Sequence, residues 1–273
     1  ESRDISQELM EAFKTYGGDR HQLLKDHIRV DYLYALSGQR ESLVDWYPFR
    51  PEGTLLQVGS DYGALTGVYA RKVSRVDVLD ESEENLAMNR LRHVETDGRD
   101  NVAYHKGGIC LYAARCEETY DYIVFVGSLG DNPEKQLQAA KRILKPEGEI
   151  LVAACNPLGI KYWAGVPKDQ NSFSKNTLTH ILKGDEESGE VKFYYPMPDY
   201  RLPVTIFSDD YLPVKGDLTD TVAAYDYPRY IGLDVGAKFD EVCEDGQFDR
   251  YANSYLAVWK DGGQDRDEKA VEY

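Results

Sequence analysis

Apolar residues recur along the first fifty positions at the spacing of an α-helix. In residues 5–14, and again in residues 21–36, they stand three and four positions apart, which places them on one face of a helix. The pair Gly17-Gly18 separates the two stretches, since consecutive glycines interrupt helices. The pattern therefore predicts a helical N-terminal segment over residues 1–50.

From residue 54 onward, short runs of β-branched and apolar residues alternate with helical stretches. The predicted strands are 54–58, 75–79, 102–105, 122–126, 150–154, 191–195 and 254–259, and the predicted helices are 63–72, 83–94, 133–144, 174–182 and 235–244. This alternation is typical of βαβ units. We therefore predict an α/β domain over residues 51–273 with a mostly parallel, seven-stranded sheet, and we expect its ligands at the carboxyl ends of the strands.

A stretch rich in proline and tyrosine interrupts this pattern before the last strand. It covers about residues 157–234, is too long for a plain connection, and predicts a lid-like insertion over the site. Tyrosines such as Tyr200 and Tyr211 suit either the stacking of a sugar or ordinary half-buried packing. Tyr194 and Tyr195 are neighbours in a predicted strand, so they point to opposite faces of the sheet.

Charge and composition exclude several classes of function. The chain has 48 acidic and 32 basic residues, a net charge of −16, which disfavours binding to the phosphates of a nucleic acid. It has no apolar run of about 18 residues and no secretory leader pattern, so we expect no membrane span and a cytoplasmic location. The four cysteines form no Cys-x-x-Cys pair and match no histidine spacing, so we predict no metal site.

Residues 55–67 carry the most informative local signal. An apolar strand runs into a turn with Gly59 and Gly63 and then into a predicted helix, which places backbone N–H groups at the carboxyl edge of the sheet. Asp80 ends the next strand 21 positions after Gly59, where nucleotide-binding domains keep an acid for ribose hydroxyls. The alternative role of Asp80 is to cap the helix that begins near Ser82.

Two cofactor classes fit this layout, and charge separates them. NAD brings a pyrophosphate to the turn, where the carboxylate of Asp61 would repel it. S-adenosyl-L-methionine brings no phosphate, and its ends are an ammonium, a carboxylate and a sulfonium. The sequence therefore favours S-adenosyl-L-methionine and keeps NAD as a minor alternative.

Several longer motifs resemble the class I S-adenosylmethionine-dependent methyltransferases found with glycosyltransferases in bacterial gene clusters for surface polysaccharides such as capsule and O-antigen. The motifs are ALSGQR (35–40), DWYPF (45–49), GALTG (63–67), YDYIV (120–124), RILKPEGE (142–149), NPLGIKYWAG (156–165), FYYPMPDY (193–200) and FSDDYLP (207–213). The resemblance implies a Rossmann-like fold and methyl transfer to a sugar of a surface polysaccharide or its precursor. It also implies a glycosyltransferase as a partner.

The resemblance also assigns site residues by position. The implied cofactor-binding residues are Gln57, Gly59, Ser60, Asp61, Gly63, Asp80, Glu81, Gly107, Gly108, Ile109, Gly127 and Ser128. Asn156 follows the fifth strand, where acceptor-side residues project in the family, and is a candidate catalytic residue. His105, His180 and Asp199 are further candidates, because histidine and aspartate serve as general bases.

Three of these positions depart from the family pattern. Gln57 stands where glutamate is usual, Asp61 where glycine is usual, and Gly108 where aspartate or asparagine is usual. A lost hydrogen bond to a charged group costs about 1.5–3 kcal/mol. The alternative function is therefore a non-catalytic binding or scaffolding module with a degenerate cofactor pocket. We also hypothesise that Asp61 turns toward the cofactor ammonium and replaces the charge missing at Gln57.

Overall fold

An eight-stranded sheet forms the centre of the computed structural model, which describes residues 5–184, 188–221 and 232–261. The strands are β1 (Thr54–Val58), β2 (Arg75–Asp80), β3 (Val102–Lys106), β4 (Tyr120–Val126), β5 (Leu144–Cys155), β6 (Glu190–Met197), β7 (Thr205–Ser208) and β8 (Ser254–Lys260). Their order in the sheet is β3-β2-β1-β4-β5-β8-β6-β7. β1 to β5 are parallel, and the pairs β5–β8, β8–β6 and β6–β7 are antiparallel. This arrangement confirms the predicted α/β fold.

The sheet has one strand more than the seven predicted. The additional strand, β7, has four residues, lies at the edge and is preceded closely by Pro203. So short a run, beside a proline, carries almost no periodic signal. Its strand character comes from pairing with β6, where Tyr195 lies opposite Phe207.

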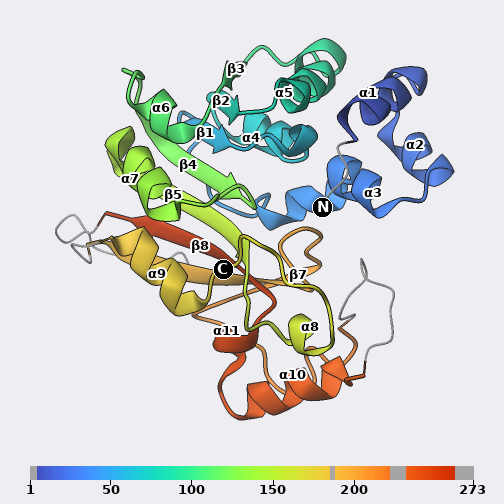
Figure 1. Ribbon diagram of the computed structural model, residues 1–273, viewed down its shortest axis with the longest axis vertical. Helices are drawn as coiled ribbons and strands as arrows, with labels where there is room; N and C mark the ends of the chain where they lie inside the picture. Colours follow the sequence, from blue (N-terminus) through green and yellow to red (C-terminus); the bar gives the residue numbers. More distant parts are fainter. Residues whose placement is uncertain (1–4, 185–187, 222–231, 262–273) are drawn as a thin grey trace.

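Helices cover both faces of the sheet (Figure 1). α4 (Thr66–Lys72) and α5 (Glu83–Arg90) pack on one face, and α6 (Ile109–Ala113), α7 (Pro133–Arg142) and α9 (Lys175–Lys183) pack on the other. After β5 comes the short helix α8 (Ile160–Trp163), and before β8 come α10 (Val235–Glu244) and α11 (Phe248–Tyr251). Within the described residues, no helix has the length and apolar character needed to cross a membrane.

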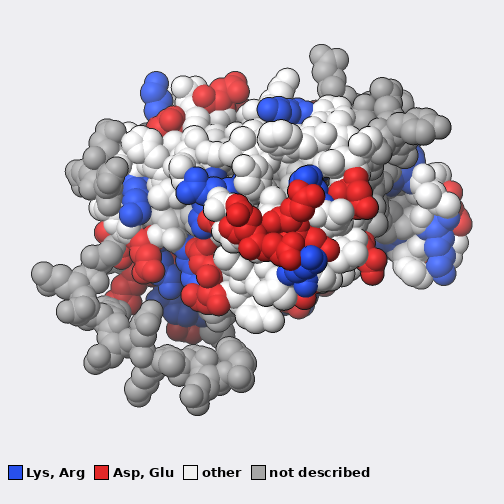
Figure 2. Space-filling view, turned by 90° about the horizontal axis from the view of Figure 1, so that it is seen from below, with Lys and Arg blue, Asp and Glu red and all other residues white. Residues whose placement is uncertain are grey.

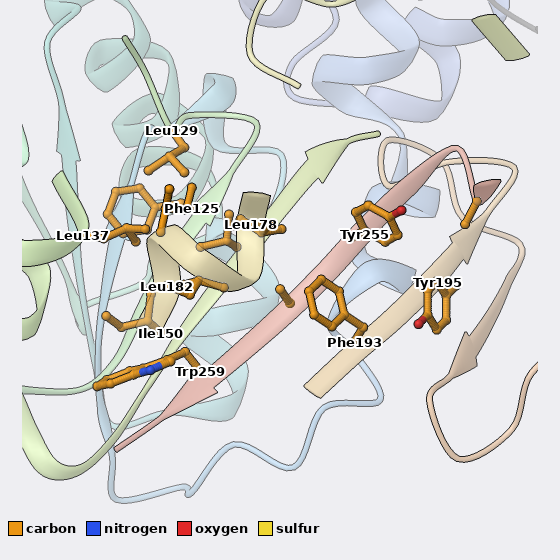
Figure 3. Packing of buried hydrophobic residues seen from close by; sticks show 14 of the residues in the cluster. Phe125, Leu129, Leu137, Ile150, Leu178, Leu182, Phe193, Tyr195, Tyr255 and Trp259 are labelled. Atoms are coloured by element: carbon orange, nitrogen blue, oxygen red, sulfur yellow. The ribbon is translucent and has the colours of Figure 1, made fainter. Parts of the chain in front are cut away.

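Successive side chains of the central strands enter two different cores. In β4, Ile123 and Phe125 are buried on the α7 side, whereas Val124 between them is buried on the α4 side. Strands buried on both faces read as continuous apolar runs, and this is how the pattern revealed them. Figure 3 shows the first core, in which Leu182 of α9 lies close to Ile150 of β5.

The N-terminal segment packs against the sheet domain through a third core. It consists of α1 (Ser6–Thr15), α2 (Arg20–Asp26), α3 (Val30–Leu36) and the 3-10 helix η1 (Gly38–Leu43), and Leu9 meets Met88 of α5 in this core. The helix expected over residues 21–36 is two helices, α2 and α3. Ile28 carried the apolar pattern across the break, but it is 93% exposed.

The predicted insertion, about residues 157–234, contributes strands and helices to the fold as well as residues that line the cavity. It contributes α8, α9, β6 and β7, and its residues 185–187 and 222–231 lie outside the described part of the chain. Tyr194 and Tyr195 point to opposite faces as predicted, since each packs against a different core. The segment after β6, with Tyr200 and Arg201, reaches the cavity described below.

Candidate functional site

A cavity of about 510 Å³ lies where the parallel strands β1 to β4 end. Small-molecule sites span about 300–1,000 Å³. Its lining residues are Tyr34, Arg40, Val58, Gly59, Asp61, Leu79, Asp80, Glu81, Asn85, Gly107, Gly108, Ile109, Val126, Gly127, Ser128, Gln136, Tyr200 and Arg201. The strand ends, the loops after them and the first turns of α5, α6 and α7 supply most of them, and the N-terminal segment and the insertion supply the rest. This is the edge of the sheet at which the sequence predicted a ligand.

Glycine lets the turns after β1 and β4 come close together. Gly59 has a φ of 86°, and a Cβ at this position would lie 2.5 Å from the Cβ of Ser128. Gly127 has a φ of 66°, and a Cβ there would lie 2.6 Å from the phenol oxygen of Tyr200. Any other residue at either position would be strained and would intrude on the space between the strand ends.

Asp80 joins the ends of β1 and β2. One of its carboxylate oxygens accepts hydrogen bonds from the backbone N–H and the hydroxyl of Ser60, at 2.7 and 2.8 Å. The N-terminus of α5 is capped by Ser82 instead, because the Ser82 hydroxyl oxygen accepts the N–H of Asn85 at 3.1 Å. Asp80 therefore braces the β1 turn while it lines the cavity, and the capping role goes to its neighbour.

Glu81 places a second carboxylate beside the end of β3. A Cβ on Gly108 would lie 2.5 Å from Oε1 of Glu81, so only glycine leaves this carboxylate in place. The backbone N–H of Gly107 donates to the carbonyl of Asp80 at 2.9 Å. The ends of β2 and β3 thus bring two acids next to Gly107, Gly108 and Ile109.

Gln57 lies behind the cavity and does not line it. Its amide donates to the carbonyl of Gly59 at 3.1 Å, and its amide oxygen accepts the hydroxyl of Thr66 at 2.7 Å. The side-chain bonds of Gln57 are therefore used to hold the β1 turn. Two other predicted contact residues, Ser60 and Gly63, also lie outside the lining.

Asp61 forms an ion pair with Arg40 of η1. The Arg40 side chain is 3% exposed, and its Nε is a buried donor without a partner among the described residues. The sequence did not predict this pairing, and the hypothesis that Asp61 turns toward a cofactor ammonium stays a prediction, since Asp61 also lines the cavity. Because Asp61 is paired with Arg40, the charge argument against a pyrophosphate rests on Asp80 and Glu81.

The helical residues 91–96, η3 (Leu91–Thr96), support the β1 turn from behind. His93 Nε2 lies 2.8 Å from the carbonyl oxygen of Gly63. The buried Arg92 donates to the carbonyls of Ala35 and Tyr62, at 2.6 and 2.7 Å. Arg92 thereby ties α3 of the N-terminal segment to the turn, so this segment is part of the site's architecture.

Tyr34, Tyr200 and Arg201 form a further wall of the cavity, called here the tyrosine–arginine wall. The Arg201 guanidinium carbon lies 5.2 Å from the ring centre of Tyr200 and 5.6 Å from that of Tyr34. Burial raises the pKa of Tyr200, so its phenol keeps its proton at neutral pH. The wall therefore offers two aromatic faces, a phenol donor and a cation to a ligand.

Behind this wall lies a charge cluster of Lys161, Asp169, Asp199 and Arg201. Arg201 donates to one oxygen of Asp169 at 2.9 Å. Lys161, with a side chain 5% exposed, lies 3.8 Å from Asp169 and 3.7 Å from Asp199. Burial raises the pKa of Asp169, but Arg201 and the hydroxyl of Tyr162 outweigh it and hold that pKa below its usual range.

None of the four candidate catalytic residues lines the cavity. The buried amide of Asn156 donates to the carbonyls of Arg250 and Ala252, at 2.8 Å each, so it holds the approach to β8. His105 Nε2 lies 3.1 Å from Asp77 of β2, its ring is beside that of Tyr112 in α6, and it does not line the cavity. His180 lies in a separate hollow between α7 and α9, and Asp199 belongs to the charge cluster.

Nine of the twelve predicted contact residues do line the cavity: Gly59, Asp61, Asp80, Glu81, Gly107, Gly108, Ile109, Gly127 and Ser128. The sequence did not assign Arg40, Asn85, Gln136 or Arg201 to the site. Arg40 stands within the motif at 35–40, and Arg201 directly follows the motif at 193–200. The motifs therefore held a usable signal, but only the fold shows that these segments meet.

Comparison with family models finds no match, and comparison with curated proteins finds none either. Among solved structures, the chain resembles the N-methyltransferase NodS from Bradyrhizobium japonicum in complex with S-adenosyl-l-homocysteine, at 14% identity and a TM-score of 0.51. The match covers 93% of this chain and 99% of that one. It also resembles a SAM-dependent methyltransferase from Thermotoga maritima, at 15% identity and a TM-score of 0.50, covering 92% and 99%.

A chain in the complex of the Haloferax volcanii Trm112 methyltransferase activator with a methyltransferase is similar as well. It shares 15% identity and a TM-score of 0.51 with this chain, over 95% of this chain and 100% of that one. These likenesses concern the fold. The chain has the Rossmann-like fold of the class I S-adenosylmethionine-dependent methyltransferases, as the sequence predicted.

Proposed function

We propose that this chain is an S-adenosylmethionine-dependent methyltransferase. The observation that carries the proposal is the cavity at the carboxyl ends of β1 to β4, with Asp80 and Glu81 beside glycine turns. It lies in a fold shared with methyltransferases, one of which was solved with S-adenosyl-l-homocysteine. The size of the cavity and its polar groups suit a nucleoside-containing ligand.

The lining residues fit the parts of S-adenosylmethionine. Asp80 and Glu81 offer acceptors to the two ribose hydroxyls, and Gly107 to Ile109 lie where the adenine would pack. Gly59 and Gly127 leave room for the methionine part, since a Cβ at either would intrude. The cation for its carboxylate is the guanidinium of Arg40, which lines the cavity and has further N–H donors besides the one that is paired with Asp61.

The bound cofactor supplies a methyl group on a sulfonium for in-line displacement by an acceptor atom. The work left to the chain is to align the acceptor and exclude water. Tyr200 is placed to do both: it is buried, protonated and packed against Gly127 at the end of β4. We assign it a positioning role, in which its phenol oxygen accepts a hydrogen bond from the acceptor hydroxyl, with Arg201 beside it.

The finer proposal concerns the acceptor, a sugar of a bacterial surface polysaccharide or its precursor. It is supported by the motifs at 156–165 and 193–200, which supply Tyr162 to the surroundings of the charge cluster and Tyr200 to the tyrosine–arginine wall. Aromatic faces next to hydrogen-bonding groups suit the apolar and hydroxylated faces of a sugar. A cytoplasmic location and a glycosyltransferase partner belong to this same proposal.

One observation favours the second candidate, a non-catalytic binding module. Gln57 and Asp61, which stand at two of the departures from the family pattern, are both engaged by other residues of the chain. Neither offers a free carboxylate to an ammonium. A pocket that has lost this contact would bind the cofactor weakly, and the fold would then serve a partner instead.

Calorimetric titration of the purified chain with S-adenosylmethionine and with S-adenosylhomocysteine tests the proposal. We expect dissociation constants of about 1–100 μM for both, corresponding to about 5.5–8 kcal/mol. NAD, the control ligand, should not bind. No binding of either ligand at about 1 mM would reject the methyltransferase and favour the non-catalytic module.

A pair of glycine variants locates the binding. Gly127→Ala puts a Cβ 2.6 Å from the Tyr200 hydroxyl and should weaken binding at least about tenfold. Gly38→Ala is the matched control, because nothing lies within 4 Å of its Cβ position. Equal affinity for both variants would place the ligand outside this cavity.

A further inference from the structure

A second cavity, of about 670 Å³, lies between α8, α10 and α11. Its floor is apolar and includes Ile160 of α8 and Val242 of α10. Two aromatic side chains, Trp163 and Tyr251, also line it. Neither the cofactor site nor the charge cluster includes any of these residues.

Trp163 is unusual for a large aromatic residue because 68% of it is exposed. Its indole N–H donates to the carbonyl of Leu158 at 3.2 Å, and this bond fixes how the ring stands on α8. The indole ring is therefore held in place while most of its surface stays exposed. Such an exposed ring suits a flat, weakly apolar ligand surface.

The cavity has polar groups that suit hydroxyls. Glu241 and Asp245, both exposed, come from α10 and its C-terminal end, and Gln247 adds an amide with a donor and an acceptor. Lys238 is ion-paired with Glu241, so it adds no free positive charge. The cavity therefore combines an apolar floor and an aromatic face with hydrogen-bonding groups of net negative charge.

The surrounding surface restricts the charge of the occupant. Figure 2 shows the side of the molecule on which α10 lies in Figure 1, and acidic side chains gather at its centre. Glu244 of α10 is exposed on this helix in addition to Glu241 and Asp245. Lys215 pairs with Glu244 at 2.8 Å, as Lys238 pairs with Glu241, so Asp245 supplies the excess negative charge. An anionic ligand such as a phosphate or a polyanion would be repelled here. Among uncharged ligands, one that carries hydroxyls fits the carboxylates and the amide of Gln247 best.

We propose that this second cavity binds a neutral saccharide through stacking on Trp163. One face of a pyranose ring presents C–H groups to the indole, while its hydroxyls donate to the carboxylates and bond to Gln247. This inference rests on the proposed function, because it makes the cavity an anchor for a part of the acceptor distant from the methylated group.

The helix α8 connects this anchor to the first cavity. Trp163 lines the second cavity, and the preceding residue, Tyr162, donates a hydrogen bond to Asp169 at 2.7 Å. Asp169 in turn accepts from Arg201, which lines the first cavity. The binding site at Trp163 is thus connected to the tyrosine–arginine wall through α8 and two hydrogen bonds, Tyr162 to Asp169 and Arg201 to Asp169.

The test is a ligand-observed NMR titration of the full chain, without cofactor, against neutral tetrasaccharides built from glucose, galactose, rhamnose or N-acetylglucosamine. At about 10 mM ligand, a dissociation constant of about 1 mM gives about 90% occupancy. We expect at least one tetrasaccharide to bind. Trp163→Ala should weaken that binding at least about tenfold, and Trp163→Phe, which keeps a ring, should weaken it less.

Trp46→Ala is the matched control, since Trp46 is also a partly exposed indole, at 42%, but lies beside Tyr194 instead. It should leave saccharide binding unchanged. The inference is overturned if no tetrasaccharide binds, or if Trp163→Ala and the parent bind equally. It is also overturned if the cavity takes an apolar probe such as n-hexanol in a Trp163-dependent way and takes no saccharide.

Asp245→Ala separates the polar part of the site from the aromatic part. It should weaken tetrasaccharide binding several-fold, because it removes an acceptor for ligand hydroxyls. The cofactor titration described above keeps the two proposals apart. Cofactor binding without saccharide binding rejects the anchor alone, and saccharide binding without cofactor binding rejects the methyltransferase alone.

Discussion

The β1 turn and the charge cluster flank the same cavity but are held together in different ways. The turn depends on hydrogen bonds between side chains and backbone groups, in which the N–H of Ser60 donates to the Asp80 carboxylate and the Gln57 amide donates to the carbonyl of Gly59. The cluster depends on four buried or half-buried charges from α8, from the loop after it and from the segment after β6. The turn should therefore tolerate neutral substitutions, whereas each charge of the cluster needs its partners.

The largest effect is expected from Lys161→Met. This change keeps most of the side-chain volume but leaves Asp199 and Asp169 without their shared cation. We expect a loss of about 3–5 kcal/mol in the free energy of unfolding, measured by urea denaturation. Lys192→Met, at an exposed ion pair with Asp210, should cost less than about 1 kcal/mol. Similar losses for the two variants would show that the cluster is not a unit.

Asp169→Asn should destabilise the fold by about 2–4 kcal/mol at pH 7, because Asp199 is then left as the one carboxylate of the cluster for both Arg201 and Lys161. The pKa of Asp169 is lower in the folded protein than in the unfolded chain. As the pH falls below the unfolded value, the unfolded chain therefore binds more protons at this residue than the folded protein does. The contribution of Asp169 is therefore present above about pH 4 and is lost at lower pH.

The difference in the free energy of unfolding between the parent and Asp169→Asn should accordingly shrink by more than about 1 kcal/mol between pH 5 and pH 2.5. These two pH values lie about one unit or more on either side of the ordinary pKa of an aspartate, about 4. Urea denaturation at a series of pH values measures it. If the difference in free energy of unfolding stayed constant over that range, the pKa of Asp169 would be the same in the folded and the unfolded protein, contrary to this prediction.

Asp80→Asn tests the cofactor side. Asparagine keeps the size of the side chain but removes the charged carboxylate that would accept hydrogen bonds from the ribose hydroxyls. Affinity for S-adenosylmethionine should therefore fall about tenfold to a hundredfold. Calorimetry measures the change. The matched control is Glu83→Gln on α5, an exposed acid outside the lining. An unchanged affinity in Asp80→Asn would assign the ribose contact to Glu81.

The smallest effect is expected from Asp61→Asn. Its carboxylate is paired with Arg40, so it contributes little to a ligand, and affinity for S-adenosylmethionine should change less than about threefold. A loss of more than about tenfold would support the hypothesis that Asp61 contacts the cofactor ammonium. The titration is the same as for Asp80→Asn, so the two changes can be compared directly.

Much of the fold was readable from the sequence because its signals are local. The strand at 54–58 and the helix at 235–244 were predicted with the bounds that the structure shows, since continuous apolar runs and helical spacing need no distant partner. The four-residue β7 was missed because its strand character depends on β6. The break between α2 and α3 was missed because the exposed Ile28 imitates a buried position.

The candidate site divides in the same way. Glycines in turns and acids at strand ends, such as Gly59 and Asp80, could be located from the sequence because topology places successive strand ends at one edge. Side-chain direction could not be located in this way. His105, a candidate general base in β3, has its side chain against Asp77 and does not line the cavity.

The sequence by itself determined the α/β class, most of the strands and the longer helices between them, and the edge of the sheet at which a ligand is expected. Only the tertiary structure decided that Arg40 pairs with Asp61, that Tyr200 and Arg201 reach the cavity, and that Lys161 lies between two acids. The physical reason is the range of the interactions. Periodicity and turn chemistry act over a few residues, whereas an ion pair or a cavity wall exists only after distant segments have packed.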